Sequence, residues 1–76
     1  MDHDLFETYV VLCETGSITK TADLLYKTQP AISARIQQLE NELGCTLVHR
    51  EKGKKNIILT PRGEAFLKTA QKFIEL

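Results

Sequence analysis

The residues that could support catalysis or metal binding are scattered along this 76-residue chain. His3 lies near the N-terminus and His49 lies beside Arg50, and neither has a partner at the spacing of metal ligands. The four glycines are too dispersed to form a phosphate-binding loop. Cys13 and Cys45 lie among apolar residues with no CxxC partner, so we interpret them as small hydrophobic residues, with redox sensing as the alternative. The sequence predicts no catalytic residues, no metal and no cofactor.

The distribution of charge points instead to a binding function. The formal net charge is zero, yet residues 1–26 carry five acids and one base, while residues 27–62 carry seven bases and three acids. A neutral chain with a basic middle segment is typical of a molecule that presents one face to a polyanion. Nucleic acid is therefore the predicted partner.

A helix predicted from about Gln29 to Leu43 has the composition of a groove-binding element. One side repeats apolar residues at helical spacing: Ile32, Ile36, Leu39 and Leu43. The opposite side is small and uncharged near its start, and it holds or is flanked by Gln29, Pro30, Ser33, Ala34, Gln37 and Asn41. Small residues allow a helix to lie deep in the major groove, and amide and hydroxyl groups can contact base edges there. We predict that this side reads DNA bases.

The remaining elements must position this helix. Apolar periodicity predicts a first helix over residues 4–15, stopped by Gly16, and a short second helix that Ser17 or Thr19 caps and that ends near Tyr26. Two strands are expected at residues 46–48 and 56–60, joined by a polar turn. A last helix starts at Thr60-Pro61. The second and third helices, joined by a tight turn, form a helix-turn-helix.

The turn between the two strands is basic and lies next to the predicted groove-binding helix. It contains Lys52, Lys54 and Lys55, and Arg50 and Arg62 flank its two ends. We expect this hairpin to act as a wing that contacts the DNA backbone or the minor groove, because phosphate contacts supply most of the affinity for DNA.

Several sequence blocks match one protein family in order. They are Gly16-Ser17-Ile18-Thr19-Lys20-Thr21-Ala22-Asp23-Leu24-Leu25, Thr28-Gln29-Pro30-Ala31-Ile32-Ser33, Ile36-Gln37-Gln38-Leu39-Glu40-Asn41-Glu42-Leu43-Gly44, Leu47-Val48-His49-Arg50 and Leu59-Thr60-Pro61-Arg62-Gly63. Across essentially its whole length the chain closely resembles the DNA-binding domain of LysR-type bacterial transcriptional regulators. The resemblance implies a mainly α, winged helix-turn-helix fold over residues 1–59, with a three-helix core and a β-hairpin wing. Residues 60–76 would be a truncated linker and dimerisation helix.

The resemblance also implies partners and residue roles. The domain would bind promoter DNA as a homodimer. The two copies would contact each other through the last helix, at residues that include Phe66, Ala70, Phe73 and Ile74. The effector-binding domain that usually follows, with its small-molecule ligand, would be absent, so we expect the chain to be a fragment, and higher assembly would need the full-length protein. The main groove-facing residues would be Thr28, Gln29, Pro30 and Ser33, and Arg50 would contact a phosphate.

Three departures from the family pattern limit this transfer. Lys27 occupies a turn position that is usually apolar. Ala34 stands where a long polar residue is common, and we expect the neighbouring Arg35 to substitute for its DNA contact. The segment between Arg50 and Leu59 is about two residues longer than usual, so the three wing lysines rest on charge and location alone.

Two alternatives remain at this point. A winged-helix module could bind protein through the apolar surface of its last helix, or the chain could belong to another winged-helix regulator family, such as the molybdate-responsive regulators. No apolar run is long enough to span a membrane, and the acidic N-terminus lacks the features of a signal peptide. We therefore expect a cytoplasmic protein.

Overall fold

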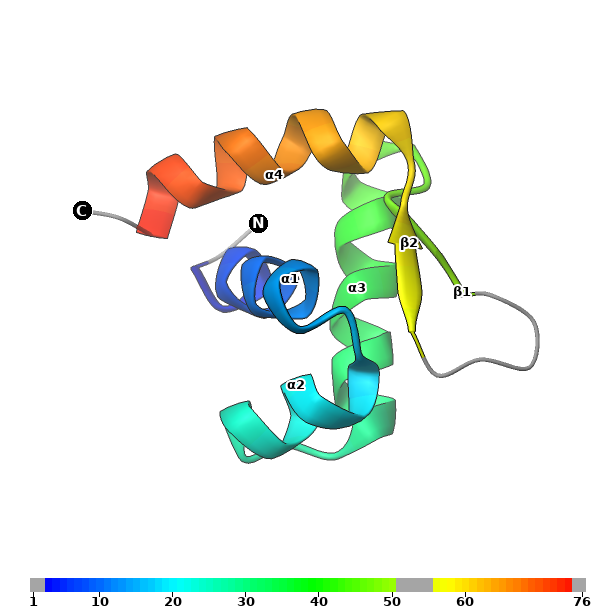
Figure 1. Ribbon diagram of the computed structural model, residues 1–76. Coiled ribbons are helices and arrows are strands. Elements are labelled where there is room, and N and C mark those ends of the chain that lie inside the picture. Colours follow the sequence, from blue (N-terminus) through cyan, green and yellow to red (C-terminus); the bar gives the residue numbers. More distant parts are fainter. Residues whose placement is uncertain (1–2, 51–55, 75–76) are drawn as a thin grey trace.

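The computed structural model describes residues 3–50 and 56–74. Its elements follow in the order α1 (His3–Thr15), α2 (Ile18–Leu25), α3 (Gln29–Leu43), β1 (Val48–Arg50), β2 (Ile57–Leu59) and α4 (Pro61–Ile74) (Figure 1). The two strands pair antiparallel, with His49 opposite Ile58. The predicted mainly α, winged helix-turn-helix fold is confirmed.

The helix boundaries follow from local capping chemistry. The Ser17 hydroxyl accepts a hydrogen bond from the Lys20 amide, so Ser17 and not Thr19 caps α2, and Thr28 caps α3 by accepting from the Ala31 amide. Gly44 ends α3 in the left-handed conformation, at φ 71°, where a side chain is disfavoured. These caps fix where the groove-binding helix starts and stops.

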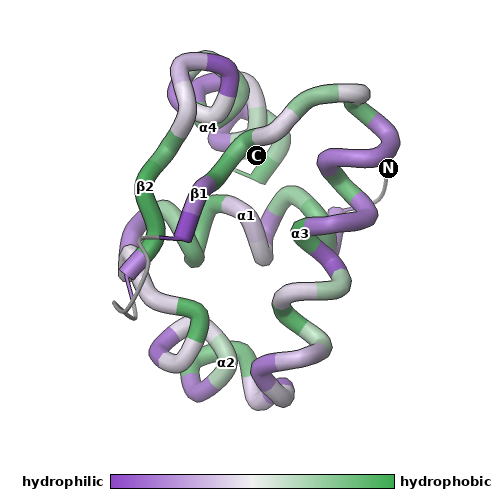
Figure 2. The backbone as a smooth tube through the Cα atoms, turned by 90° about the vertical axis from the view of Figure 1, so that its right-hand side faces the viewer, coloured by the Kyte–Doolittle hydropathy of each residue, from purple (hydrophilic) through white to green (hydrophobic). Residues whose placement is uncertain are grey.

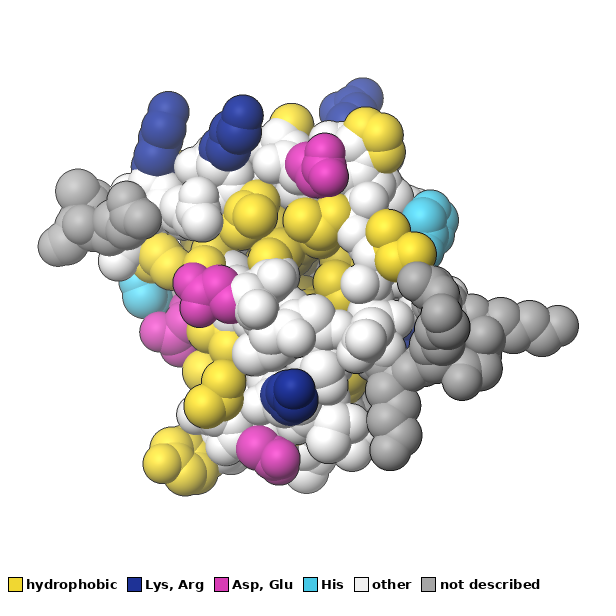
Figure 3. Space-filling model, in the orientation of Figure 1, with side chains coloured by type: hydrophobic (Ala, Val, Ile, Leu, Met, Phe, Trp, Pro, Cys, Tyr) yellow, Lys and Arg dark blue, Asp and Glu magenta, His cyan; other side chains and the backbone are white. Residues whose placement is uncertain are grey.

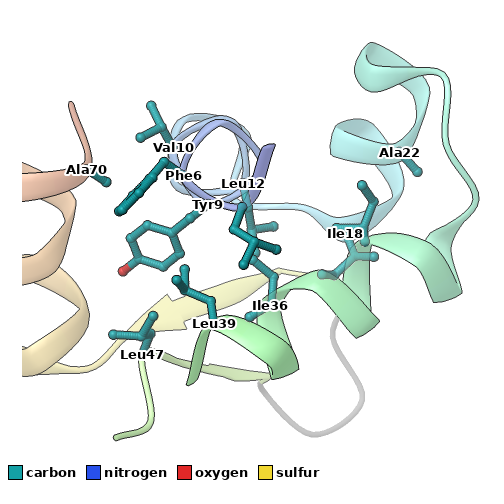
Figure 4. Packing of buried hydrophobic residues seen from close by; sticks show 12 residues of the cluster. Phe6, Tyr9, Val10, Leu12, Ile18, Ala22, Ile36, Leu39, Leu47 and Ala70 are labelled. Carbon is teal, nitrogen blue, oxygen red and sulfur yellow. The ribbon is translucent and has the colours of Figure 1, made fainter. Parts of the chain in front are cut away.

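The hydrophobic core lies between α1 and the other helices. Tyr9, Leu12, Ile32, Leu39 and Leu47 are among its fully buried side chains, and Figure 4 shows several of them converging from α1, α3 and the segment before β1. In Figure 2 the α3 segment alternates between hydrophobic and hydrophilic stretches, as expected of a helix with one buried face. The core therefore holds α3 by one side and leaves its other side exposed.

The contact between α1 and α4 is aromatic and extensive. The ring of Phe6 stacks on Phe66 and on Phe73, with centroids 5.8 and 4.6 Å apart. The Tyr9 hydroxyl donates a hydrogen bond of 2.6 Å to the carbonyl oxygen of Gly63, and burial raises the pKa of this hydroxyl well above its usual value. Ala70 is 0% exposed. This corrects the expectation that Ala70 faces a dimer partner, because its surface is already covered within the chain.

The strands begin and end differently from the prediction. β1 covers Val48–Arg50 and not residues 46–48, and β2 covers Ile57–Leu59 without Thr60. The Leu47 amide is bound by the Glu40 carboxylate and not by a strand partner, and Thr60 caps α4 through a bond from the Gly63 amide to its hydroxyl. The Thr60 cap agrees with the predicted start of the last helix at Thr60-Pro61, whereas alternation of apolar residues could not reveal the bond from the Leu47 amide to Glu40.

The wing is also tied to the start of α2. The Ile57 amide donates to the Gly16 carbonyl oxygen at 2.9 Å, and Ser17 forms a bridge with Asn56. β2 therefore lies between β1 and the α1–α2 connection, which fixes the base of the wing relative to the helix-turn-helix.

Gly63 offers a test of how tightly these elements meet. A Cβ atom at this position would lie 2.1 Å from the backbone oxygen of Leu47, whereas one at Gly44 would meet nothing within 4 Å. We expect Gly63→Ala to lower the free energy of unfolding by about 2–3 kcal/mol through overpacking. Gly44→Ala should lower it by about 1–2 kcal/mol through backbone conformation alone.

Thermal melting measures both variants, since 1 kcal/mol shifts the Tm of a domain this size by about 4–8 °C. Gly44→Asn is the matched control, because Asn tolerates the left-handed conformation and should recover part of the loss. A Gly63→Ala protein that melts with the wild type would contradict the close approach of Gly63 to Leu47.

Candidate nucleic-acid interface

The exposed side of α3 is uncharged over its first two turns and beyond. Gln29, Pro30, Ala34 and Gln37 are all exposed, as is the capping residue Thr28. The first carboxylate of α3 is Glu40, so the N-terminal half of the helix holds no acid. The helix dipole adds partial positive charge at this end. The start of α3 can therefore approach an anionic backbone and base edges without electrostatic repulsion.

A side-chain hydrogen bond joins α3 to the wing. The guanidinium of Arg50, at the end of β1, donates to the Ser33 hydroxyl. The pair borders a hollow of about 330 Å³ between α3 and the wing, lined by Ile18, Ser33, Ile36, Gln37, Glu40, Val48 and Arg50. The structure thus brings together a residue predicted to read bases and one predicted to bind phosphate.

Further along α3, side-chain bonds order the polar surface. The Gln37 amide nitrogen donates to the Asn41 side-chain oxygen at 3.0 Å, one helical turn away. This bond holds the Gln37 side chain along the helix before any ligand arrives, which lowers the entropy lost when it is fixed in a complex.

Glu40 was not singled out from the sequence, yet it fixes the wing to α3. One of its carboxylate oxygens accepts hydrogen bonds from the Leu47 amide at 2.7 Å and from the Val48 amide at 3.3 Å. Charge-assisted bonds of this kind are stronger than neutral ones. A carboxylate on a predicted polar helix face gives no sequence signal for such a contact, because the acceptor's partners lie seven and eight residues away in an irregular segment.

Two of the predicted backbone contacts lie away from the exposed start of α3. The Arg35 guanidinium donates to the Thr8 hydroxyl of α1 at 3.0 Å, so its side chain is directed to the interior side of α3 and does not replace a contact at Ala34. Arg62 borders a hollow with Leu43 and Cys45, at the other end of α3. Lys52, Lys54 and Lys55 lie outside the described residues.

The described part of the chain offers little basis for metal binding, membrane spanning or thiol chemistry. Over residues 3–50 and 56–74, no group of three or more His, Cys, Asp or Glu residues could hold a metal ion, and no helix is long and apolar enough to cross a membrane. Cys13 and Cys45 are half-buried free thiols that pack against the core. Burial raises the pKa of the Cys13 thiol to about 11, so its nucleophilic thiolate form is rarer at neutral pH than that of an exposed cysteine.

Comparison with known proteins agrees with this geometry. Residues 3–64 match the family model described as bacterial regulatory helix-turn-helix protein, lysR family. The transcriptional regulator HdfR of Yersinia enterocolitica is 44% identical over 71 residues, which cover 93% of this chain and 24% of HdfR. HdfR of Yersinia pestis is 42% identical over the same length. The chain thus spans about a quarter of the length of the curated relatives it matches.

Solved structures show the same fold. The CbnR DNA-binding domain in complex with DNA superimposes with a TM-score of 0.92 at 32% identity, covering 99% of this chain and 84% of that one. The BenM DNA-binding domain with catB site 1 DNA superimposes with a TM-score of 0.89 at 37% identity, covering 99% of this chain and 78% of that one. Vibrio fischeri DarR in complex with DNA gives 0.90 at 37% identity, covering 99% of this chain and 25% of DarR.

The role of Glu40 can be tested by removing its carboxylate. Glu40→Ala leaves the amide of the buried Leu47 without its acceptor and should lower the free energy of unfolding by about 1–3 kcal/mol, whereas Glu40→Gln retains an acceptor oxygen and should cost less. Denaturant titration gives both values. Gln38→Ala, an exposed polar substitution on the same helix, should stay within about 0.5 kcal/mol of the wild type. Equal stability of the Glu40→Ala and Gln38→Ala proteins would show that Glu40 does not hold the wing.

Proposed function

Because the chain belongs to the LysR family of bacterial regulatory helix-turn-helix proteins, we propose that it is the sequence-specific DNA-binding domain of a transcriptional regulator. Because residues 3–64 match this family, we discard the alternative that the chain belongs to another winged-helix regulator family. The relatives are named as transcriptional regulators, and we propose no catalytic activity for this domain.

The observation that carries the proposal is the exposed, uncharged side of α3. From Gln29 to Leu39 this helix carries no carboxylate, and its exposed side chains are short or end in amides. A major groove about 12 Å wide admits such a helix, and amides bind adenine edges well. We assign base contacts to Gln29, Pro30, Ala34 and Gln37, with Thr28 at the groove entrance.

The positive charge needed for affinity comes from outside this helix. Arg50 is held beside α3 by Ser33, which directs its guanidinium toward the same side as the groove-facing residues. We assign Arg50 to a phosphate, and on charge alone we assign Lys52, Lys54 and Lys55 to the DNA backbone or minor groove. Arg62 lies at the far end of α3, beside Leu43 and Cys45, and we assign no DNA contact to it.

We further propose that the domain acts as a homodimer on promoter DNA. Phe66 stacks on Phe6 and Ala70 is fully buried, so both already pack within the chain. Phe73, near the end of α4, is 53% exposed and offers an apolar contact to a second copy. α4 lies at the opposite end of the molecule from α2 and the start of α3, and Figure 3 shows Lys and Arg side chains along its outer edge. Pairing through α4 would leave both groove-binding helices available. We assign effector binding, and any assembly beyond the dimer, to a longer protein that contains this domain.

Selection of bound sequences from random duplex DNA tests the function as a whole. We expect one enriched motif, and for a dimer two inverted half-sites whose centres lie about 34 Å, one helical turn, apart. An enriched motif without inverted symmetry would contradict the dimer, and absence of any bound duplex at low salt would contradict DNA binding itself.

The assigned roles of α3 and the wing predict different mutational effects. Gln29→Ala should lower affinity for the selected site by about 1–3 kcal/mol and relax base choice at one position. Arg50→Ala should weaken selected and unrelated duplexes by a similar factor and reduce the slope of log K against log salt by about 1. Fluorescence anisotropy over a salt series measures both. Identical behaviour of the two variants on selected and random DNA would show that these roles are wrongly divided.

A further inference from the structure

Tyr26 occupies the turn of the helix-turn-helix in an unusual way. Its backbone is left-handed, at φ 56° and ψ 43°, and it is the one non-glycine residue with positive φ in residues 3–50 and 56–74. Its side chain is 94% exposed. Left-handed backbone is unfavourable for residues with a Cβ, and Gly or Asn is the usual choice at such a helix end.

The fold uses the backbone of Tyr26 but not its ring. The Tyr26 and Lys27 amides donate to the carbonyl oxygens of Asp23 and Ala22, at 3.4 and 2.9 Å, and so end α2. Glycine could make the same bonds without strain. An almost fully exposed ring contributes little to the core. A bulky residue held in a disfavoured conformation that the fold does not need is a reason to look for an external contact.

The position of Tyr26 indicates what it contacts. It lies two residues before Thr28, the cap of α3, and next to the cationic Lys27. Figures 1 and 2 place the end of α2 and the start of α3 together, at the opposite end of the molecule from α4. When the start of α3 lies in a groove, the residues just before it face the edge of that groove, where the sugar-phosphate backbone runs.

We propose that the Tyr26 ring lies against the sugar-phosphate backbone at the edge of the major groove, with its hydroxyl donating a hydrogen bond to a phosphate oxygen. The inference rests on the proposed function and adds a contact to it. Tyrosine side chains are among the donors that proteins use for phosphates, and such contacts are the same for every base sequence. Because the phenol is neutral, the contact displaces no counterion.

The test compares Tyr26→Gly and Tyr26→Phe with the wild type. Tyr26→Gly should melt at or above the wild-type temperature, because the disfavoured conformation is relieved, while its affinity for duplex DNA falls about tenfold, as expected for the loss of one hydrogen bond and its apolar contact. The loss should be equal on the selected site and on unrelated duplexes, with an unchanged salt slope. Tyr26→Phe keeps the ring and should lose about threefold.

Several outcomes would overturn the inference. One is a Tyr26→Gly protein that binds duplex DNA as tightly as the wild type, which would indicate that the ring contacts a protein partner and not DNA. Another is a loss of affinity confined to the selected sequence, which would mean that Tyr26 contacts a base and not the backbone. A third is a salt slope reduced by about 1, which means that the effect acts through Lys27. If Tyr26→Gly does not fold, Tyr26→Asn provides the same comparison, since Asn tolerates this backbone. Failure of the wild type to bind any duplex would instead refute the proposed function.

Discussion

The fold depends on the close approach of the first turn of α4 to the segment that follows α3. Gly63 comes so near the backbone of Leu47 that no side chain fits between them, and the Tyr9 hydroxyl closes the same junction by donating to Gly63. Leu47 is in turn held by Glu40 through its amide. One tyrosine, one glycine and one glutamate therefore link α1, α4 and α3. Because the amide and carbonyl groups of both Leu47 and Gly63 are hydrogen-bonded, the two segments can approach each other closely without burying an unpaired backbone group.

This junction lets α3 carry two unrelated functions on its two sides. Ile32, Ile36 and Leu39 are buried and anchor the helix, so its orientation is set by the core. The exposed side is free of packing constraints and can carry short uncharged residues that fit a groove. A helix with fewer buried contacts would lose this precision, because groove contacts require side chains to be positioned before binding.

The proposed function assigns DNA affinity and base specificity to different parts of the domain. α3 itself carries Arg35 as its one cation, and Arg35 is bonded to Thr8 on the interior side. In the proposed complex the positive charge toward DNA comes from Arg50 and the three wing lysines, and the Ser33–Arg50 bond connects Arg50 to α3. A domain with zero formal net charge can in this way present a basic edge to a polyanion. Tyr26 extends the same edge with a neutral contact.

The sequence by itself determined the order of the elements, the ends of α2 and α3 and the family. Capping residues, glycines and apolar periodicity act over a few residues, so Thr28 and Gly44 could be interpreted without tertiary information, and the cap of α2 was narrowed to Ser17 or Thr19. The tertiary structure alone decided the direction of Arg35, the burial of Ala70, the strand limits and the role of Glu40. Each of these depends on contacts between segments that are distant in sequence or lie in irregular backbone. Local pattern carries no information about such contacts.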